Sequence, residues 1–174
     1  MQRQIRALVI AMALTTLALP SWAIAQQKSD EQEHAALAKA MKEAKVSLQN
    51  GLAASAKAGT PISAKYEVEH DKLQLSVYTM KGDKFAETIV DHNNGKVAKT
   101  DPITEGDDLT AAKVQAEAMA KAKRSLADAV GQAVKANAGY RAISVRPAVS
   151  DGHPVAEVVL LKDADWKTVS EKLD

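Results

Sequence analysis

An internal repeat constrains the fold of this 174-residue chain more than any other feature of its sequence. Shifting the sequence by 78 residues superposes its two alanine-rich segments in one register and without a gap. Because methionine and leucine match as well as alanine and lysine, duplication of one unit explains the register better than shared helix composition does. Both halves are therefore expected to adopt the same fold. The matching pairs include Ala40 with Ala118, Met41 with Met119, Ser47 with Ser125, Leu48 with Leu126 and Ala64 with Ala142.

The alanine-rich segments have the periodicity of amphipathic helices. Apolar side chains recur at steps of three and four residues, which gives one apolar stripe along each segment. In the first copy, a capping box of Ser29 and Gln32 indicates the beginning of the helix and Gly59 its end. One long helix per copy is therefore predicted. The stripe residues are Leu37, Met41, Ala44, Leu48 and Leu52 in the first copy, and Met119, Ala122, Leu126, Val130 and Ala133 in the second.

Each predicted helix is followed by segments in which apolar and polar residues alternate, which is the pattern of half-buried strands. The fold class predicted is α+β, with two repeats of one long helix packed on a three- to four-stranded antiparallel sheet. Strands are expected at 62–68, 73–78 and about 85–90 in the first copy, and at about 140–146, 155–162 and 166–172 in the second.

One predicted strand differs from the others. The segment from Val155 to Leu161 is apolar on both faces, whereas the middle strand of the first copy is amphipathic. A strand of this kind is normally covered on both sides. Its own helix covers one side, and docking of the two copies is the simplest cover for the other. A second chain or a partner protein is the alternative.

The amino terminus has the three-part pattern of a secretory signal peptide. Arg3 and Arg6 precede an apolar run that ends near Leu19, and small residues follow at Ala23 and Ala25. The run is shorter than the 20 or so residues of a membrane-spanning helix. We expect cleavage after Ala25, export to the periplasm and no membrane anchor after processing. The expected organisation is a signal peptide at 1–25, a first repeat at 26–100, a linker at 101–109 and a second repeat at 110–174.

The charge of the processed chain argues against a nucleic-acid partner. Removal of residues 1–25 takes away two arginines and leaves 21 basic against 22 acidic side chains, a net charge of −1. A nearly neutral surface of mixed sign lacks the basic footprint of proteins that bind phosphate backbones. The chain also lacks cysteine, so packing without disulfides must stabilise it.

The order of a helix, three antiparallel strands and a closing Asp-x-x-x-Gly-Lys-Val turn resembles the PepSY domain. The first copy matches this pattern nearly end to end. The second copy departs from it, because the chain stops at 171–174, where the closing turn would fall. The matching residues are the helix from about Ser47 to Ala58, the strands Ile62–Val68 and Leu73–Tyr78, and the turn Asp91–Val97.

PepSY domains are best known from the propeptides of thermolysin-like metallopeptidases, where they inhibit or chaperone the protease, and they also occur free-standing in bacterial envelopes. The resemblance implies a non-enzymatic periplasmic protein that binds and regulates another envelope protein, with inhibition of a protease as one form of that regulation. It implies no cofactor. The sequence agrees with a non-enzymatic reading, because no nucleophile, zinc-peptidase or phosphate-loop motif occurs in it.

Two turns of the first copy carry candidate metal ligands. In a three-stranded meander, the first turn and the end of the third strand lie at the same edge of the sheet. His70 and Asp71 should therefore lie near Asp91 and His92, a set of side chains that could bind Zn²⁺ or Cu²⁺. Solvated turn residues are the simpler interpretation, and we predict no dedicated metal site.

The face of the first sheet opposite its helix is the candidate partner-binding surface. An aromatic side chain on an otherwise polar face suits contact with a protein. If this face is open and flat, a protein partner is favoured. A deep apolar pocket between the copies would favour the alternative function, a periplasmic carrier of a small ligand or metal. The candidate residues are Lys65, Glu67, Gln74, Ser76 and Tyr78.

Overall fold

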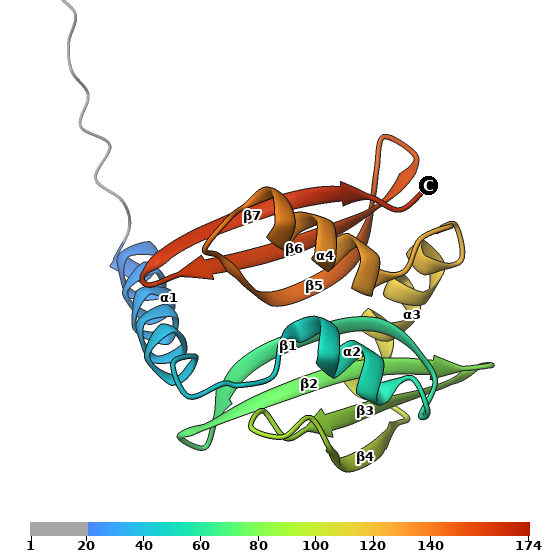
Figure 1. Cartoon of the computed structure of the whole chain (residues 1–174), viewed down its shortest axis with the longest axis horizontal. Helices are drawn as coiled ribbons and strands as arrows, with labels where there is room; N and C mark the ends of the chain where they lie inside the picture. The colour runs from blue at the N-terminus through green and yellow to red at the C-terminus, as the bar shows by residue number, and fades with distance from the viewer. Residues whose placement is uncertain (1–20) are drawn as a thin grey trace, which may run out of the picture.

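The computed structural model describes residues 21–174, with side chains from residue 31 onward. The expected basic region and apolar run of the signal peptide lie outside the described residues. The first helix begins at Ser21, upstream of the expected cap at Ser29. The elements, in chain order, are α1 (Ser21–Ala40), α2 (Leu48–Ser55), β1 (Thr60–Glu69), β2 (Lys72–Lys81), β3 (Lys84–Val90), β4 (Val97–Ile103), α3 (Gly106–Met119), α4 (Leu126–Ala136), β5 (Arg141–Ser150), β6 (His153–Lys162) and β7 (Asp165–Lys172) (Figure 1).

All seven strands form one antiparallel sheet, with the order β4-β3-β2-β1-β5-β6-β7. The expectation of a separate three- to four-stranded sheet in each copy is therefore wrong. The first strands of the two copies pair at the centre, where Ala64 lies opposite Val145 and Lys65 opposite Ser144. Two separate sheets would each expose an edge of unpaired backbone groups at this strand, and pairing satisfies those groups. We call the β1–β5 junction the seam.

The expectation of one long helix per copy is also wrong. The first copy has two helices, α1 and α2, which are separated at residues 41–47, and the second has α3 and α4. The break is built by hydrogen bonds. The Ser47 hydroxyl accepts from the backbone N–H of Asn50 and caps α2, while the N–H groups of Lys45 and Val46 both donate to the carbonyl oxygen of His92. The apolar stripe continues through this corner, so its periodicity gave no sign of the break.

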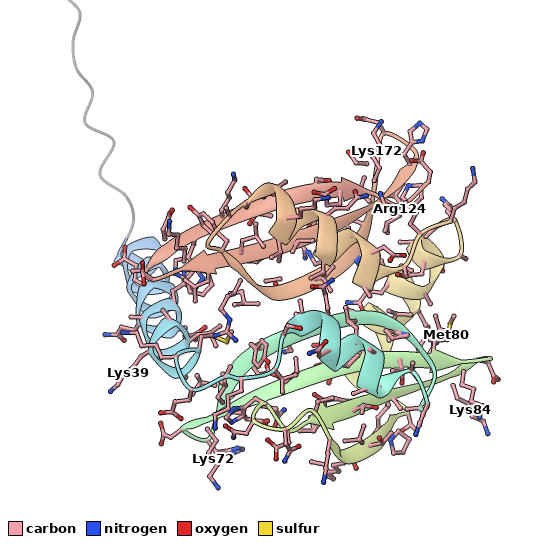
Figure 2. All side chains as sticks on the ribbon, in the orientation of Figure 1. Lys39, Lys72, Met80, Lys84, Arg124 and Lys172 are labelled. Carbon is pink, nitrogen blue, oxygen red and sulfur yellow. The ribbon has the colours of Figure 1, made fainter. Side chains whose placement is uncertain are left out.

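The second copy repeats this corner. Ser125 caps α4, and the N–H groups of Lys123 and Arg124 donate to the carbonyl oxygen of Leu173. The Arg124 guanidinium also donates to the carbonyl oxygen of Lys172 at 2.9 Å. Figure 2 labels both residues. Equivalent hydrogen bonds at equivalent places support the duplication.

The strands lie close to their predicted positions, but their repeat distance is not 78. Each first strand has a bulge, at Ile62 in β1 and at Ile143 in β5, so the strands repeat at 81 residues. The structural equivalent of Ala64 is thus Val145, not Ala142. The difference arises because α4 is three residues longer than α2. The first copy also has a fourth strand, β4, which includes residues 101–103 of the expected linker.

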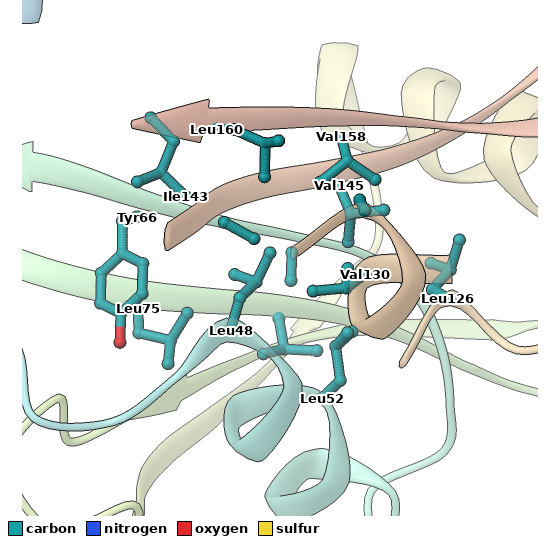
Figure 3. Close-up of a cluster of buried hydrophobic side chains, with 14 of the residues drawn as sticks. Leu48, Leu52, Tyr66, Leu75, Leu126, Val130, Ile143, Val145, Val158 and Leu160 are labelled. Atoms are coloured by element: carbon teal, nitrogen blue, oxygen red, sulfur yellow. The ribbon is translucent and has the colours of Figure 1, made fainter. Parts of the chain in front are cut away.

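The helices α2 and α4 lie side by side on one face of the sheet, which we call the front face (Figures 1 and 3). They bury one continuous apolar core that draws on both copies, so the two copies dock on each other. Tyr66 lies in this core and its hydroxyl donates to the carbonyl oxygen of Val46 at 2.6 Å. Core residues labelled in Figure 3 include Leu48, Leu52, Leu75, Leu126, Val130, Ile143, Val145, Val158 and Leu160.

The helices α1 and α3 each reach the other copy. In Figure 1, α3 runs behind β1 and β5, and its Ala112 shares a buried cluster with Ile62 and Phe85 of the first copy. Correspondingly, the ring of His34 on α1 stacks on Trp166 of the second copy, with ring centroids 4.2 Å apart. Phe85 and Trp166 are equivalent third-strand positions. Each of these helices therefore reaches one side chain on the third strand of the other copy, while α1 packs mainly on β1 and β2 and α3 mainly on β5 and β1.

Candidate functional site

A pocket of about 300 Å³ opens on the back face of the sheet, the face opposite α2 and α4. It lies on the seam, so both copies contribute to its walls, and α3 closes one side of it. We call it the seam pocket. The polar side chains that line it are Ser63, Lys65 and Tyr78 of the first copy, Asp108 and Gln115 of α3, and Ser144 and Arg146 of β5.

The repeat itself places one cation on each side of the seam. The sequence Ile-Ser-Ala-Lys at 62–65 of β1 is equivalent to Ile-Ser-Val-Arg at 143–146 of β5. Alternation along a strand sends the serine and the cation to the same face. Antiparallel pairing then brings the two sets together around the seam, so the pocket is close to symmetric in its serines and cations.

All five side chains predicted as a partner surface belong to one connected group. Gln74 donates to the Ser76 hydroxyl at 3.0 Å, and Ser76 donates to Glu67 at 2.9 Å. The other carboxylate oxygen of Glu67 lies 2.6 Å from Nζ of Lys65. This ammonium lies 5.9 Å from the ring centroid of Tyr78, within the range of a cation–π contact. The prediction that these side chains share one face is confirmed by these contacts.

The second copy supplies its own ion pair beside this group. Arg146 contacts Oε2 of Glu157 through both Nε and Nη2, each at 2.6 Å. In addition, Ser63 donates to the side-chain carbonyl of Gln115 at 2.7 Å, which fixes α3 over the pocket. The two cations thus have carboxylate partners already, and they present the remaining N–H groups to the pocket.

The electrostatics keep Lys65 charged and Tyr78 neutral. Partial burial alone would lower the pKa of Lys65, but the hydrogen bond to Glu67 and the nearby Tyr78 outweigh it and raise that pKa. Burial raises the pKa of Tyr78 to about 12. At neutral pH the phenol therefore keeps its proton and can donate a hydrogen bond to an occupant of the pocket.

The back face is neither fully open nor deeply hollow at this place. Ser76 has no exposed surface, whereas 44% of the Lys65 side chain is exposed. The sequence analysis missed five of the polar lining residues: Ser63, Asp108, Gln115, Ser144 and Arg146. The repeated Ile-Ser-x-cation pattern contains Ser63, Ser144 and Arg146, but the shift of 78 residues does not align its two copies.

The candidate metal ligands do lie at one edge of the sheet. Asp91 and His92 line a shallow groove with His70 of the first turn. The Asp91 carboxylate is nevertheless occupied by hydrogen bonds, and Nδ1 of His92 is buried. The backbone N–H of Asn93 donates to Asp91 at 2.8 Å and lowers the pKa of that carboxyl, and the second carboxylate oxygen accepts from the Asn94 amide.

The two remaining candidates, His70 and Asp71, form the two-residue turn between β1 and β2. Both have positive φ angles, 48° and 59°, and 90% of the His70 side chain is exposed. From residue 31 onward, no three His, Cys, Asp or Glu side chains are placed to hold a metal ion. The groove therefore gives no support for a metal site.

Comparisons with known proteins add nothing to this geometry. No family model, no curated protein and no solved structure matches the chain. Within the described residues, no helix is long and apolar enough to cross a membrane.

Proposed function

We propose that this chain is an exported, non-enzymatic, PepSY-like protein of the bacterial envelope that binds and regulates another envelope protein, with inhibition of a protease as one form of that regulation. The binding surface is the back face around the seam pocket. One observation carries the proposal: the five side chains predicted as a partner surface form one connected group that lines or adjoins a pocket shared by both copies.

The chemistry of the pocket favours recognition over catalysis. Each cation has a carboxylate partner at 2.6 Å. The serine hydroxyls are not placed next to a histidine among the lining residues, so no nucleophile and general base stand together. Held in this way, the polar groups form a fixed pattern of donors and acceptors. A polar segment of a partner can match that pattern while one of its side chains enters the pocket.

A second candidate function rests on the size of the same pocket. About 300 Å³ lies at the small end of the range for small-molecule sites. Under this alternative the protein is a periplasmic carrier, and a small polar ligand occupies the seam pocket in place of a partner segment.

In-cell crosslinking with a photoreactive amino acid tests the proposal. Position 146 faces the pocket, position 99 lies on the same face on β4, and position 57 lies after α2 on the opposite side. We expect a heterologous crosslink of defined mass from 146, a weaker one from 99 and none from 57. Filling the pocket with Ser144→Tyr in a protein crosslinked from position 99 should abolish the adduct.

Two outcomes would contradict the proposal. Crosslinks only between copies of this chain would show self-association in place of regulation. A purified protein that carries a co-purifying small molecule, released on denaturation and absent from Ser144→Tyr, would favour the carrier function. Circular dichroism of Ser144→Tyr provides the control for correct folding.

A further inference from the structure

A second pocket, of about 270 Å³, lies between the end of α1 and the β6–β7 turn, and the seam-pocket proposal does not use it. Three cations line it, Lys42, Arg141 and Lys162, together with one carboxylate, Asp163. We call it the corner pocket. Its lining carries a net charge of +2, in contrast to the paired charges of the seam pocket.

None of the three cations has a carboxylate partner. The ion pairs formed by residues 31–174 include neither lysine nor Arg141. The Arg141 guanidinium donates to the carbonyl oxygens of Met41 and Ala44, at 2.9 and 2.8 Å, which satisfies two carbonyl groups of the turn after α1 and fixes the guanidinium in place. An arginine has five N–H donors, so three remain after these two bonds.

The duplication supplies an internal comparison for this pocket. The positions equivalent to Lys42, Arg141 and Lys162 are Ala120, Thr60 and Lys81. The equivalent place in the other copy thus has one cation in place of three. The fold does not require the cluster, and its positive charge belongs to this corner alone.

We propose that the corner pocket binds a phosphate-type dianion, either inorganic phosphate or a phosphomonoester. A phosphate group carries a charge of about −1.5 to −2 at neutral pH, which matches the net charge of the lining. A fixed guanidinium and two ammonium groups are donors that proteins use for such an oxyanion. The Lys162 ammonium lies 6.0 Å from the ring centroid of Tyr140, a cation–π contact that leaves its N–H groups able to donate. The pocket is larger than the phosphate group, which leaves space for the first atoms of an ester substituent.

The test is calorimetric titration of the processed chain with inorganic phosphate, at an ionic strength held constant with chloride. The variant is Lys42→Ala combined with Lys162→Ala, and the matched control is Lys81→Ala, which removes a lysine from the equivalent corner. We expect saturable binding that weakens about tenfold in the double variant, as two charge contacts of ordinary strength predict, and is unchanged in the control. Asp163→Asn should strengthen binding.

Vesicles distinguish the source of the phosphate group. Co-sedimentation with phosphatidylcholine vesicles that contain phosphatidic acid, dependent on Lys42 and Lys162, would assign the pocket to a lipid headgroup. Phosphate binding without co-sedimentation would assign it to a soluble anion. If phosphate and the vesicles both fail to bind, or if the double variant and Lys81→Ala weaken binding equally, the proposal is wrong. None of these outcomes depends on the seam pocket.

Discussion

The two copies form the same turn between their two helices, but the residue that accepts its hydrogen bonds has a different side chain in each copy. In each copy, one carbonyl oxygen after the third strand accepts two N–H groups from the turn between the helices, and this oxygen belongs to His92 in the first copy and Leu173 in the second. Leu173 has no exposed surface, whereas Nδ1 of His92 is buried without a hydrogen-bond partner. The backbone geometry is thus retained because its N–H groups need an acceptor, while the side chain is free to differ.

The helices α2 and α4 differ in a similar way. Each has an internal glycine, Gly51 in α2 and Gly131 in α4. A methyl group on Gly51 would lie 2.6 Å from Cδ2 of Leu75, which is fully buried. A methyl group on Gly131 would lie 2.8 Å from Nε2 of Gln49, the end of a flexible side chain. The two glycines are not equivalent positions, because Gly51 matches Ala129 and Gly131 matches Ala53 in the repeat. The first copy thus packs α2 too closely on Leu75 for a methyl group, whereas the second copy buries the methyl group of Ala129 at the equivalent position.

The largest expected effect tests whether the copies are one folding unit. Leu48 and Leu126 are equivalent, almost fully buried and part of the same core cluster. Leu48→Ala and Leu126→Ala should each lower the free energy of unfolding by about 2–5 kcal/mol. Urea denaturation, followed by Trp166 fluorescence and by circular dichroism, should show one transition in both variants. Two separated transitions would mean that the copies unfold independently.

The two internal glycines, Gly51 of α2 and Gly131 of α4, give the next largest difference. Gly51→Ala should lower the free energy of unfolding by about 1–3 kcal/mol, because the methyl group overpacks the contact with Leu75. Gly131→Ala should change it by less than about 1 kcal/mol, because the better helix propensity of alanine offsets the loss of the hydrogen bond from Gln49 to the Ala127 carbonyl oxygen when Gln49 moves. Both are measured by denaturant titration of the processed chain. Equal destabilisation by the two variants would contradict the difference in packing.

Exchanging the side chains of His92 and Leu173 should change the free energy of unfolding in opposite directions. His92→Leu removes a buried nitrogen without a partner and should raise the free energy of unfolding by about 1 kcal/mol, since such a group costs about 1–3 kcal/mol. Leu173→His should lower it by at least as much. Protection of the Lys45 and Val46 amides from hydrogen exchange reports the first corner directly, and the Lys123 and Arg124 amides are the internal control. A loss of stability in His92→Leu would contradict this account.

The smallest expected effect is a pH dependence that arises from one hydrogen bond of the second copy. Nδ1 of His153 lies 2.6 Å from Oδ2 of Asp174, and this hydrogen bond lowers the pKa of the Asp174 carboxyl. A lowered pKa in the folded state contributes stability above the ordinary aspartate value of about 4, and that contribution is lost as the pH falls through the folded pKa. NMR titration of the carboxyl carbon should show the pKa rising toward its ordinary value in His153→Ala. An unchanged titration would contradict the bond.

The sequence predicted the strands and the shared face of the five polar residues, because alternation along a strand directly determines which side chains lie together. It did not predict the single sheet, since the pairing of β1 with β5 rests on backbone groups that every strand possesses. Nor did it predict that α3 covers the pocket. The buried residues of α3 are Ala112 and Ala118, and in a helix so rich in alanine the buried and exposed faces differ little in hydrophobicity.

The crossing of α1 and α3 to opposite copies has a consequence for how the chain reaches its final form. A chain that emerges amino terminus first presents β3 before α3 exists, so Phe85 remains uncovered until residues beyond 106 arrive. The stacking of His34 on Trp166 likewise forms only after residue 166, close to the end of the chain, has been delivered. These two contacts between the copies therefore form late, after most of the polypeptide has been delivered.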